Sequence, residues 1–435
     1  ALISGSLSGT SVNGRGGQFS LDAGSFSQLS DVETASGTSK GLLSLLSEGG
    51  FDEAVSIQLR SGSISLGNGD EISANTVQLI ADDGSITLEN GSSLSASGYD
   101  GGRIELWANY NTNLRAGSTI NATGLEGEGG EVILSSNQGT VYVDDSSHVL
   151  LGGANSGGQL HIRAGREYSN DTDLFASDVR VSHFDPVAVV SGADEIRIEA
   201  FETYGSGAKL GDLFSDGSIS AADIEALKAE TDGFMANCQT NESCQYWSNN
   251  SVDLLPGVQV EVNGDLVLDT NWDLLEWRYD DNPGVLTLLS SGSMTFNSSL
   301  KDGLITDIVD PGWGMPTYEV VNAATGDSWS YRIAAGADLT SASPLAAQVS
   351  SNSGKLLLEN GAKIISGTGD IDVSASGNIT LADQTAVIMT VGEDAGLGAA
   401  DLFAETDTTG VAGYLFPQIL AGQSLVNGGD LRITA

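Results

Sequence analysis

The twelve-residue stretch Asp212–Asp223 contains oxygen-bearing side chains at the spacing of a calcium-binding loop. Such a loop takes oxygen ligands from positions 1, 3, 5, 7, 9 and 12 and needs glycine at position 6 for a sharp turn. Gly217 stands at position 6. The ligands at positions 1, 5, 7, 9 and 12 would be Asp212, Asp216, Ser218, Ser220 and Asp223. The stretch is therefore a candidate calcium site, to which Ser218 would contribute its carbonyl oxygen.

The same stretch has a second interpretation, as an acidic turn that leads into a capped helix. Phe214 stands at position 3 and supplies no side-chain oxygen, and Asp223 is shorter than the usual glutamate at position 12. The residues that follow, 224–230, are helical in composition. The loop resembles an EF-hand loop of the dockerin type, but dockerins carry two such loops and one is present here. The sequence indicates no cofactor other than calcium.

Paired acids could act as a general acid and a general base if a fold placed them on adjacent strands. The pairs are Asp82-Asp83, Asp144-Asp145 and Asp280-Asp281. All three stand in turn-like sequence, where aspartate usually accepts hydrogen bonds from its own backbone. The pairs leave a polysaccharide-degrading enzyme as the alternative hypothesis, and turn formation is the simpler interpretation.

Two cysteines, Cys238 and Cys244, enclose the segment Gln-Thr-Asn-Glu-Ser. A local disulfide is expected here and fits an oxidising compartment. Zinc is disfavoured because no other cysteine and no nearby histidine would complete a tetrahedral site.

Aromatic residues gather in the second half of the chain, at Trp272, Trp277, Tyr279, Trp313 and Trp329. If exposed, they could form a partner surface or stack on sugar rings. If buried, they would seal loops against the scaffold, and we favour burial. The three histidines show no metal-ligand spacing, and no nucleophile elbow, zinc-protease motif or phosphate loop is present.

The charge balance restricts the possible partners. The chain has 58 acidic and 17 basic residues, for a formal net charge of −41. This charge argues against binding nucleic acid or anionic lipid. It favours solubility and repulsion between copies. No apolar run is long enough to span a membrane.

A repeat with a constant period organises the stretch 91–165. Each unit contains a pair of glycines followed by a short alternating run, and the second glycines are Gly102, Gly130 and Gly158. Runs such as Ile-Glu-Leu and Val-Ile-Leu have the two-residue period of strands, and Gly, Asn and Ser punctuate the turns. A fixed period of this length is typical of stacked repeats, in which each unit completes the core of its neighbour. The pattern predicts an all-β fold, a parallel β-helix solenoid with loop and helical insertions.

The same pattern divides the chain. We expect coils at 1–36, a short helical excursion at 37–54, coils with the repeat of about 28 residues at 55–200, an insertion with the calcium-like loop and the cysteines at 201–250, coils at 251–300, a loop insertion at 301–328, and coils at 329–435. The chain begins without methionine and ends on a repeat-like Gly-Gly-Asp-Leu-Arg-Ile, which is the pattern of a segment from a longer protein.

Several longer phrases are more specific than the repeat. They are Gly264–Leu274 (GDLVLDTNWDL), Trp277–Tyr279 (WRY), Pro283–Leu288 (PGVLTL) and Ser328–Leu339 (SWSYRIAAGADL). The chain resembles large exoproteins of the filamentous-haemagglutinin type through most of its length. The resemblance implies a right-handed parallel β-helix, export by a Gram-negative bacterium through a two-partner secretion transporter of the outer membrane, and a surface or shed adhesin. The family has no catalytic residues to transfer.

The sequence thus favours a non-enzymatic, secreted, rod-like segment of a bacterial adhesin or extracellular fibre, active in attachment, self-assembly or biofilm formation. Its expected partners are other copies of itself, joined head to tail or laterally, or glycans of a host or neighbouring surface. The expected location is the bacterial cell surface or the medium. A polysaccharide-binding or polysaccharide-degrading β-helix protein is the alternative.

Overall fold

The structure is a computed structural model. It describes residues 6–11, 16–26, 28–34, 37–170, 173–205, 213–214, 216–279, 282–309, 318–348, 354–394, 425–426 and 428–435. The chain forms two compact units: unit 1 is 1–202, 232–255 and 340–343, and unit 2 is 203–231, 256–339 and 344–435. Each unit is described by itself below.

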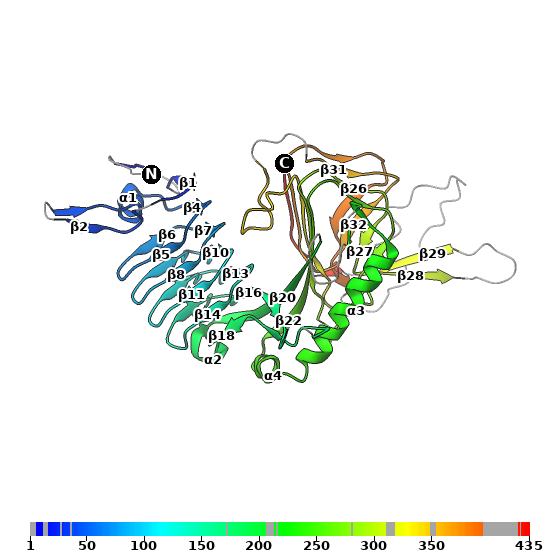
Figure 1. Ribbon diagram of the computed structural model, residues 1–435, viewed down its shortest axis with the longest axis horizontal. Helices are drawn as coiled ribbons and strands as arrows, with labels where there is room; N and C mark the ends of the chain where they lie inside the picture. The colour runs from blue at the N-terminus through cyan, green and yellow to red at the C-terminus, as the bar shows by residue number, and fades with distance from the viewer. Residues whose placement is uncertain are drawn as a thin grey trace. The chain divides into compact units, whose positions relative to one another are not determined.

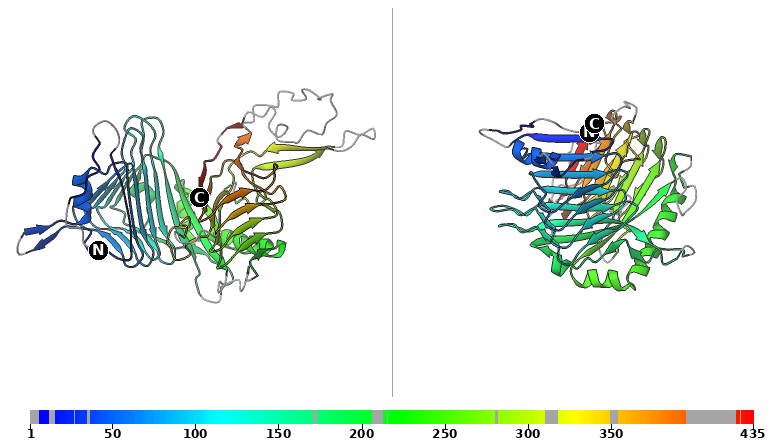
Figure 2. Two further views of the ribbon diagram at one scale, coloured as in Figure 1. Left: turned by 90° about the horizontal axis from the view of Figure 1, so that it is seen from above. Right: turned by 60° about the vertical axis from the view of Figure 1, so that its left-hand side comes forward.

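Unit 1 consists mainly of parallel sheets, whose strands lie side by side in the same order in each view (Figures 1 and 2). The first sheet contains β1 (Gln18–Ala23), β4 (Ala54–Leu59), β7 (Thr76–Ala81), β10 (Arg103–Ala108), β13 (Glu131–Ser136), β16 (Gly158–Glu167) and β20 (Ala193–Gly205), and β17 (Asp178–Val179) pairs antiparallel with β16. The second contains β5 (Ile64–Leu66), β8 (Ile86–Leu88), β11 (Thr112–Leu114), β14 (Val141–Val143) and β18 (Val181–Ser182). The third contains β6 (Glu71–Ser73), β9 (Ser93–Ser95), β12 (Thr119–Asn121), β15 (His148–Leu150) and β19 (Val190–Ser191).

From β4 onward the chain visits these three sheets in rotation, placing one strand in each before it returns to the first. Arg103 pairs with Glu131, and Glu131 pairs with Gln159. The paired positions of β10, β13 and β16 are therefore spaced along the chain as the glycine pairs are, one residue after the second glycine of each pair. Apolar positions of these strands point inward, and the aligned residues Val55, Val77, Ile104, Val132 and Leu160 are buried.

Unit 2 repeats the arrangement. Its strands are β22 (Asp253–Val262), β25 (Val285–Ser290), β30 (Ser330–Ala335), β33 (Ile371–Ala375) and β38 (Leu431–Thr434) in one parallel sheet; β21 (Ser218–Ile219), β23 (Leu266–Leu268), β26 (Met294–Phe296), β31 (Leu356–Leu358) and β34 (Ile379–Leu381) in a second; and β24 (Trp272–Asp273), β27 (Leu300–Lys301), β32 (Lys363–Ser366) and β35 (Val387–Thr390) in a third. Gly257 pairs with Val285, which is the same spacing as in unit 1. The tryptophans Trp272, Trp277 and Trp329 belong to the core of this unit.

Helices are few among the described residues: α1 (Leu42–Gly49), α2 (Pro186–Val189), α3 (Ala221–Cys238) and α4 (Glu242–Asn249). Helix α1 lies in the expected excursion at 37–54, buries its four leucines and contacts β6. Gly50 ends it in the left-handed conformation with φ 70°, which glycine adopts without a steric penalty. Strands account for 44% of the structure and helices for 11%, so the fold is all-β with long parallel sheets.

The segment at 301–328, predicted as a loop, instead contains an antiparallel pair, β28 (Leu304–Val309) with β29 (Tyr318–Ala323). It lies between Val285 and Ser330, which pair in parallel despite the additional chain that separates them. Two further antiparallel pairs are β2 (Val32–Thr34) with β3 (Gly37–Ser39), and β36 (Glu393–Asp394) with β37 (Leu425–Val426). Extra residues between paired strands are therefore accommodated without loss of the parallel register.

Candidate functional site

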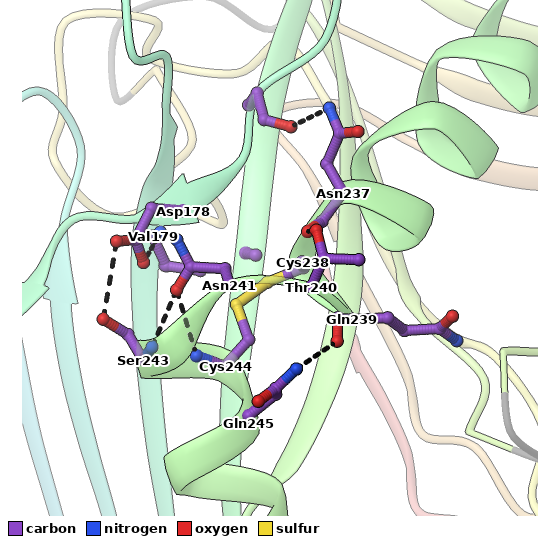
Figure 3. The surroundings of a disulfide bond; sticks show 12 residues. Asp178, Val179, Asn237, Cys238, Gln239, Thr240, Asn241, Ser243, Cys244 and Gln245 are labelled. Carbon is purple, nitrogen blue, oxygen red and sulfur yellow. Dashed lines mark hydrogen bonds between the residues drawn. A yellow bond between two sulfur atoms is a disulfide. The ribbon is translucent and has the colours of Figure 1, made fainter.

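The segment between α3 and α4 is fixed in unit 1 by a disulfide between Cys238 and Cys244, whose Cα atoms are 5.6 Å apart (Figure 3). Both cysteines are buried. Asn241 is the N-cap of α4, and its Oδ1 accepts hydrogen bonds from the backbone N–H groups of Ser243 at 2.8 Å and Cys244 at 3.3 Å. This side-chain cap satisfies two amides that a helix N-terminus leaves without partners. The disulfide and the cap together define the conformation of the turn.

A cavity of about 460 Å³, widely open to solvent, lies beside this turn. Its described walls come from two parts of the sequence, Ser169 with 173–177, and 237–241. The lining residues are Ser169, Asp173, Leu174, Phe175, Ser177, Asn237, Thr240 and Asn241. The cavity therefore combines hydroxyl and amide groups with one carboxylate and two large apolar side chains.

The wall from α3 and its following turn is positioned by hydrogen bonds. Asn237 donates from Nδ2 to the carbonyl oxygen of Ala176 at 3.1 Å, and Thr240 donates from Oγ1 to the carbonyl oxygen of Asn237 at 2.8 Å (Figure 3). Three polar groups of this wall take no further hydrogen bond within the described part of the chain: Oδ1 of Asn237, the lone pairs of Thr240 Oγ1 and the Nδ2–H groups of Asn241. These three groups are available to a ligand.

On the opposite wall the polar groups pair with one another. Asn170 donates from its backbone N–H to Oδ2 of Asp173 at 3.1 Å and from Nδ2 to Oδ1 at 2.8 Å. The hydroxyls of Ser169 and Ser177 are 2.9 Å apart. The carboxylate of Asp173 is thus partly occupied by amide donors. Leu174 lines the cavity and is 76% exposed.

The calcium-like loop is only partly described, because Asp212 lies outside the described residues. Oδ1 of Asp216 accepts from the backbone N–H of Ser218 at 3.0 Å. Oδ2 of Asp223 accepts from the backbone N–H of Ser220 at 2.8 Å and from its hydroxyl at 2.6 Å, while Ser220 Oγ accepts from the backbone N–H of Asp223 at 3.3 Å. These bonds cap α3, as the second interpretation of the loop requires.

Two further features of this loop are its strand pairing and the position of Phe214. The strand β21, which contains Ser218, pairs with β23, and Phe214 at the third position is buried with φ 62°. Across the described ranges, no group of three or more His, Cys, Asp or Glu side chains could hold a metal ion. Calcium binding stays a prediction that rests on the spacing in the sequence.

One acid of each described pair, Asp82 or Asp144, is occupied by structural hydrogen bonds. Asp82 is buried and accepts from Gln58 Nε2, Arg60 Nη1, Ser341 Oγ and the backbone N–H of Ala342, at 2.8–3.2 Å. Asp144 accepts from the hydroxyl and the backbone N–H of Ser146, and these bonds hold the pKa of its carboxyl below the usual value. A general acid needs the opposite shift. Asp280 and Asp281 lie outside the described residues.

Trp272, Trp277 and Trp329 do not form the exposed partner surface considered from the sequence. Trp272 and Trp277 are 0% and 3% exposed, and Trp329 is 0% exposed. The rings of Trp277 and Trp329 meet edge to face with centroids 5.8 Å apart. Tyr279 is half-buried against the same core, and Trp313 lies outside the described residues. An exposed role is wrong for Trp272 and Trp277, because large apolar rings gain most by completing a core.

No family model matches the chain, and comparisons with curated proteins and with solved structures give no match either. No helix among the described residues is both long and apolar enough to cross a membrane. The site is therefore argued from its own geometry. Sequence analysis missed Leu174, Asn237 and Thr240. The polar residues beside Cys238 were a signal, but the cavity wall that faces them comes from a segment much earlier in the chain.

Proposed function

We propose that the chain is a non-enzymatic, secreted segment of a bacterial surface adhesin or extracellular fibre of the filamentous-haemagglutinin type. In this proposal the parallel sheets form a right-handed β-helix solenoid that acts as a stiff, rod-like scaffold. Export would use a two-partner secretion transporter of the outer membrane. The insertions between coils would make the contacts with partners.

The observation that supports this proposal most is the constancy of strand pairing around insertions. In the first sheet of unit 1, Thr76 pairs with Arg103 and Arg103 with Glu131, at nearly equal steps along the chain. In unit 2 the step from Gly257 to Val285 is of the same length, whereas the next step, to Ser330, is much longer and still preserves the pairing. A scaffold that tolerates extra residues in its connections can present variable loops from fixed positions, which is where binding residues are usually found.

Charge supports an extracellular attachment role. A net charge of −41 keeps copies apart and discourages contact with polyanions. The Cys238–Cys244 disulfide is the kind of bond that persists in an oxidising compartment. Partners would then be neutral or cationic surface groups, including glycans, or complementary surfaces on other copies.

A polysaccharide-degrading enzyme receives less support. Its acid and base would have to come from the aspartate pairs, but Asp82 is buried under four donors and the pKa of Asp144 is lowered by its own turn. The cavity beside the disulfide is better suited to a polysaccharide-binding protein than to a polysaccharide-degrading enzyme.

Immunogold electron microscopy of the producing cells tests the proposal. We expect label on the cell surface, either repeated along filaments or at separate thin projections. Repetition along filaments would support self-assembly, whereas label at separate projections would support attachment by single molecules. Label confined to the cytoplasm would contradict the proposal.

A further inference from the structure

We propose that the cavity beside the Cys238–Cys244 disulfide binds a neutral saccharide of one or two sugar rings. This inference deepens the proposed function and rests on it for the source of the ligand, a surface glycan. The cavity volume of about 460 Å³ lies within the range of roughly 300–1,000 Å³ typical of small-molecule sites. Every residue in its walls belongs to unit 1.

The polar groups of the cavity match the chemistry of sugar hydroxyls. A sugar hydroxyl both donates and accepts, so its site needs both kinds of partner. Oδ1 of Asn237 and Oγ1 of Thr240 can accept, and Nδ2 of Asn241 can donate, because the described contacts leave these atoms available. Asn237 and Asn241 are each held by another hydrogen bond, so little side-chain freedom is lost on binding.

The apolar groups match the other face of a sugar ring. The C–H groups of a pyranose pack against apolar or aromatic side chains while its hydroxyls turn toward polar groups. Leu174 and Phe175 supply such a surface in a cavity that is otherwise hydroxyl- and amide-lined. Phe175 lies close against α3 at Gly233, where an added Cβ would overlap the ring. This contact fixes the position of the aromatic wall.

Charge selects a neutral ligand over an acidic one. Among the described lining residues, the carboxylate of Asp173 is the one ionisable group, and none of them is a lysine or arginine. Asp173 would repel the carboxylate of a sialic or uronic acid, and these described residues include no cation to compensate. The amides of Asn170 hold Asp173 in place, so the repulsion cannot be relieved without breaking two hydrogen bonds.

Saturation-transfer NMR and calorimetric titration of the purified chain test the proposal, with galactose, N-acetylglucosamine and N-acetylneuraminic acid as probes. We expect at least one neutral sugar to bind and the acidic sugar to bind more weakly. Thr240→Val removes a hydroxyl at nearly constant shape and should raise the Kd of the neutral sugar by roughly three- to tenfold. Leu174→Ser should weaken binding by a comparable factor through loss of apolar contact.

Thr380→Val in β34 is the matched control, because it makes the same change at an exposed residue outside the cavity, and it should leave the Kd unchanged. Circular dichroism of each variant verifies that the fold is retained. The proposal is overturned if neither neutral sugar binds, if the acidic sugar binds as tightly as the neutral ones, or if Thr380→Val has the effect of Thr240→Val. Sugar binding by a chain found only in the cytoplasm would contradict the proposed function and leave this site standing.

Discussion

The indole Nε1–H of Trp329 donates a hydrogen bond of 2.7 Å to the carbonyl oxygen of Trp277, in a preceding turn of the chain. The backbone N–H of Trp329 donates to Asp302 Oδ2 at 2.7 Å, and Ser366 Oγ donates to the carbonyl oxygen of Trp329 at 2.7 Å. Trp329 is therefore bonded to three separate segments of unit 2 while its ring is fully buried.

Trp329→Ala should destabilise the protein by about 3–5 kcal/mol, because it leaves a large cavity and an unpaired carbonyl. Trp329→Phe retains most of the ring volume and should cost less, about 1–3 kcal/mol. Urea unfolding followed by circular dichroism measures both. Tyr99→Phe is the control, because the Tyr99 side chain is 68% exposed, and it should leave the free energy of unfolding unchanged. Equal effects of Trp329→Ala and the control would show that the indole is not part of the core.

Arg278 and Asp302 form a buried ion pair in the same unit. Arg278 Nη2 lies 2.7 Å from Oδ1 of Asp302, and the exposed fractions of the two side chains are 19% and 0%. Arg278→Ala would leave a buried carboxylate with only backbone donors, so we expect a loss of about 3 kcal/mol. Arg432→Ala, which breaks pairs at an arginine that is 46% exposed, should cost about 0–1 kcal/mol. A loss no greater than this in Arg278→Ala would mean that solvent reaches the pair.

Glu261 gives a prediction about pH. Burial raises the pKa of its carboxyl, and a hydrogen bond with Gln259 offsets this only in part. A raised pKa means that folding favours the neutral acid. The resulting stability is present below the unfolded value, about 4.3, and is lost as the pH rises through the folded value.

Glu261→Gln removes this penalty, so the variant should unfold at a higher temperature than the parent at pH 7. The advantage should disappear below about pH 4, where the parent carboxyl is neutral in both states. Thermal unfolding across this pH range is the measurement, with Glu225→Gln on the exposed side of α3 as the control. If Glu261→Gln unfolds at a lower temperature than the parent at pH 7, the pKa of the Glu261 carboxyl is not raised in the folded protein.

The glycine pairs made the parallel stacking predictable because their requirement is local. A Cβ added at Gly130 would overlap the carbonyl oxygen of Gly102, and one at Gly158 would overlap that of Gly130. The repeated glycines therefore mark places where successive turns of the chain touch. The period in the sequence follows from that contact.

The location of the cavity and the burial of the tryptophans could not be predicted from the repeat. The cavity needs Ser169 and 173–177 to lie beside 237–241, a contact that no repeat encodes. The aromatic composition near Trp277 fits a surface as well as a core, and only the position of Trp329 decides between them. Asp223 shows the same limit, because spacing alone does not separate a metal ligand from a helix cap.

The solenoid proposed for unit 1 would have interchangeable turns. Arg103 pairs with both Thr76 and Glu131, so removal of residues 103–130 would bring Glu131 opposite Thr76. The deletion also removes β11, which pairs with β8 and β14, and β12, which pairs with β9 and β15. It would therefore bring β8 next to β14 and β9 next to β15. Deletion of a whole turn thus preserves register in all three sheets.

Thermal unfolding of this deletion variant, followed by circular dichroism, is the most direct test. We predict a β-rich spectrum and a cooperative transition close to that of the parent. Deletion of residues 103–116, half a turn, is the control and should abolish the transition, because it leaves β12 without the strands that precede it in its turn. If the whole-turn deletion unfolds the protein as completely as the half-turn deletion, the solenoid account is contradicted.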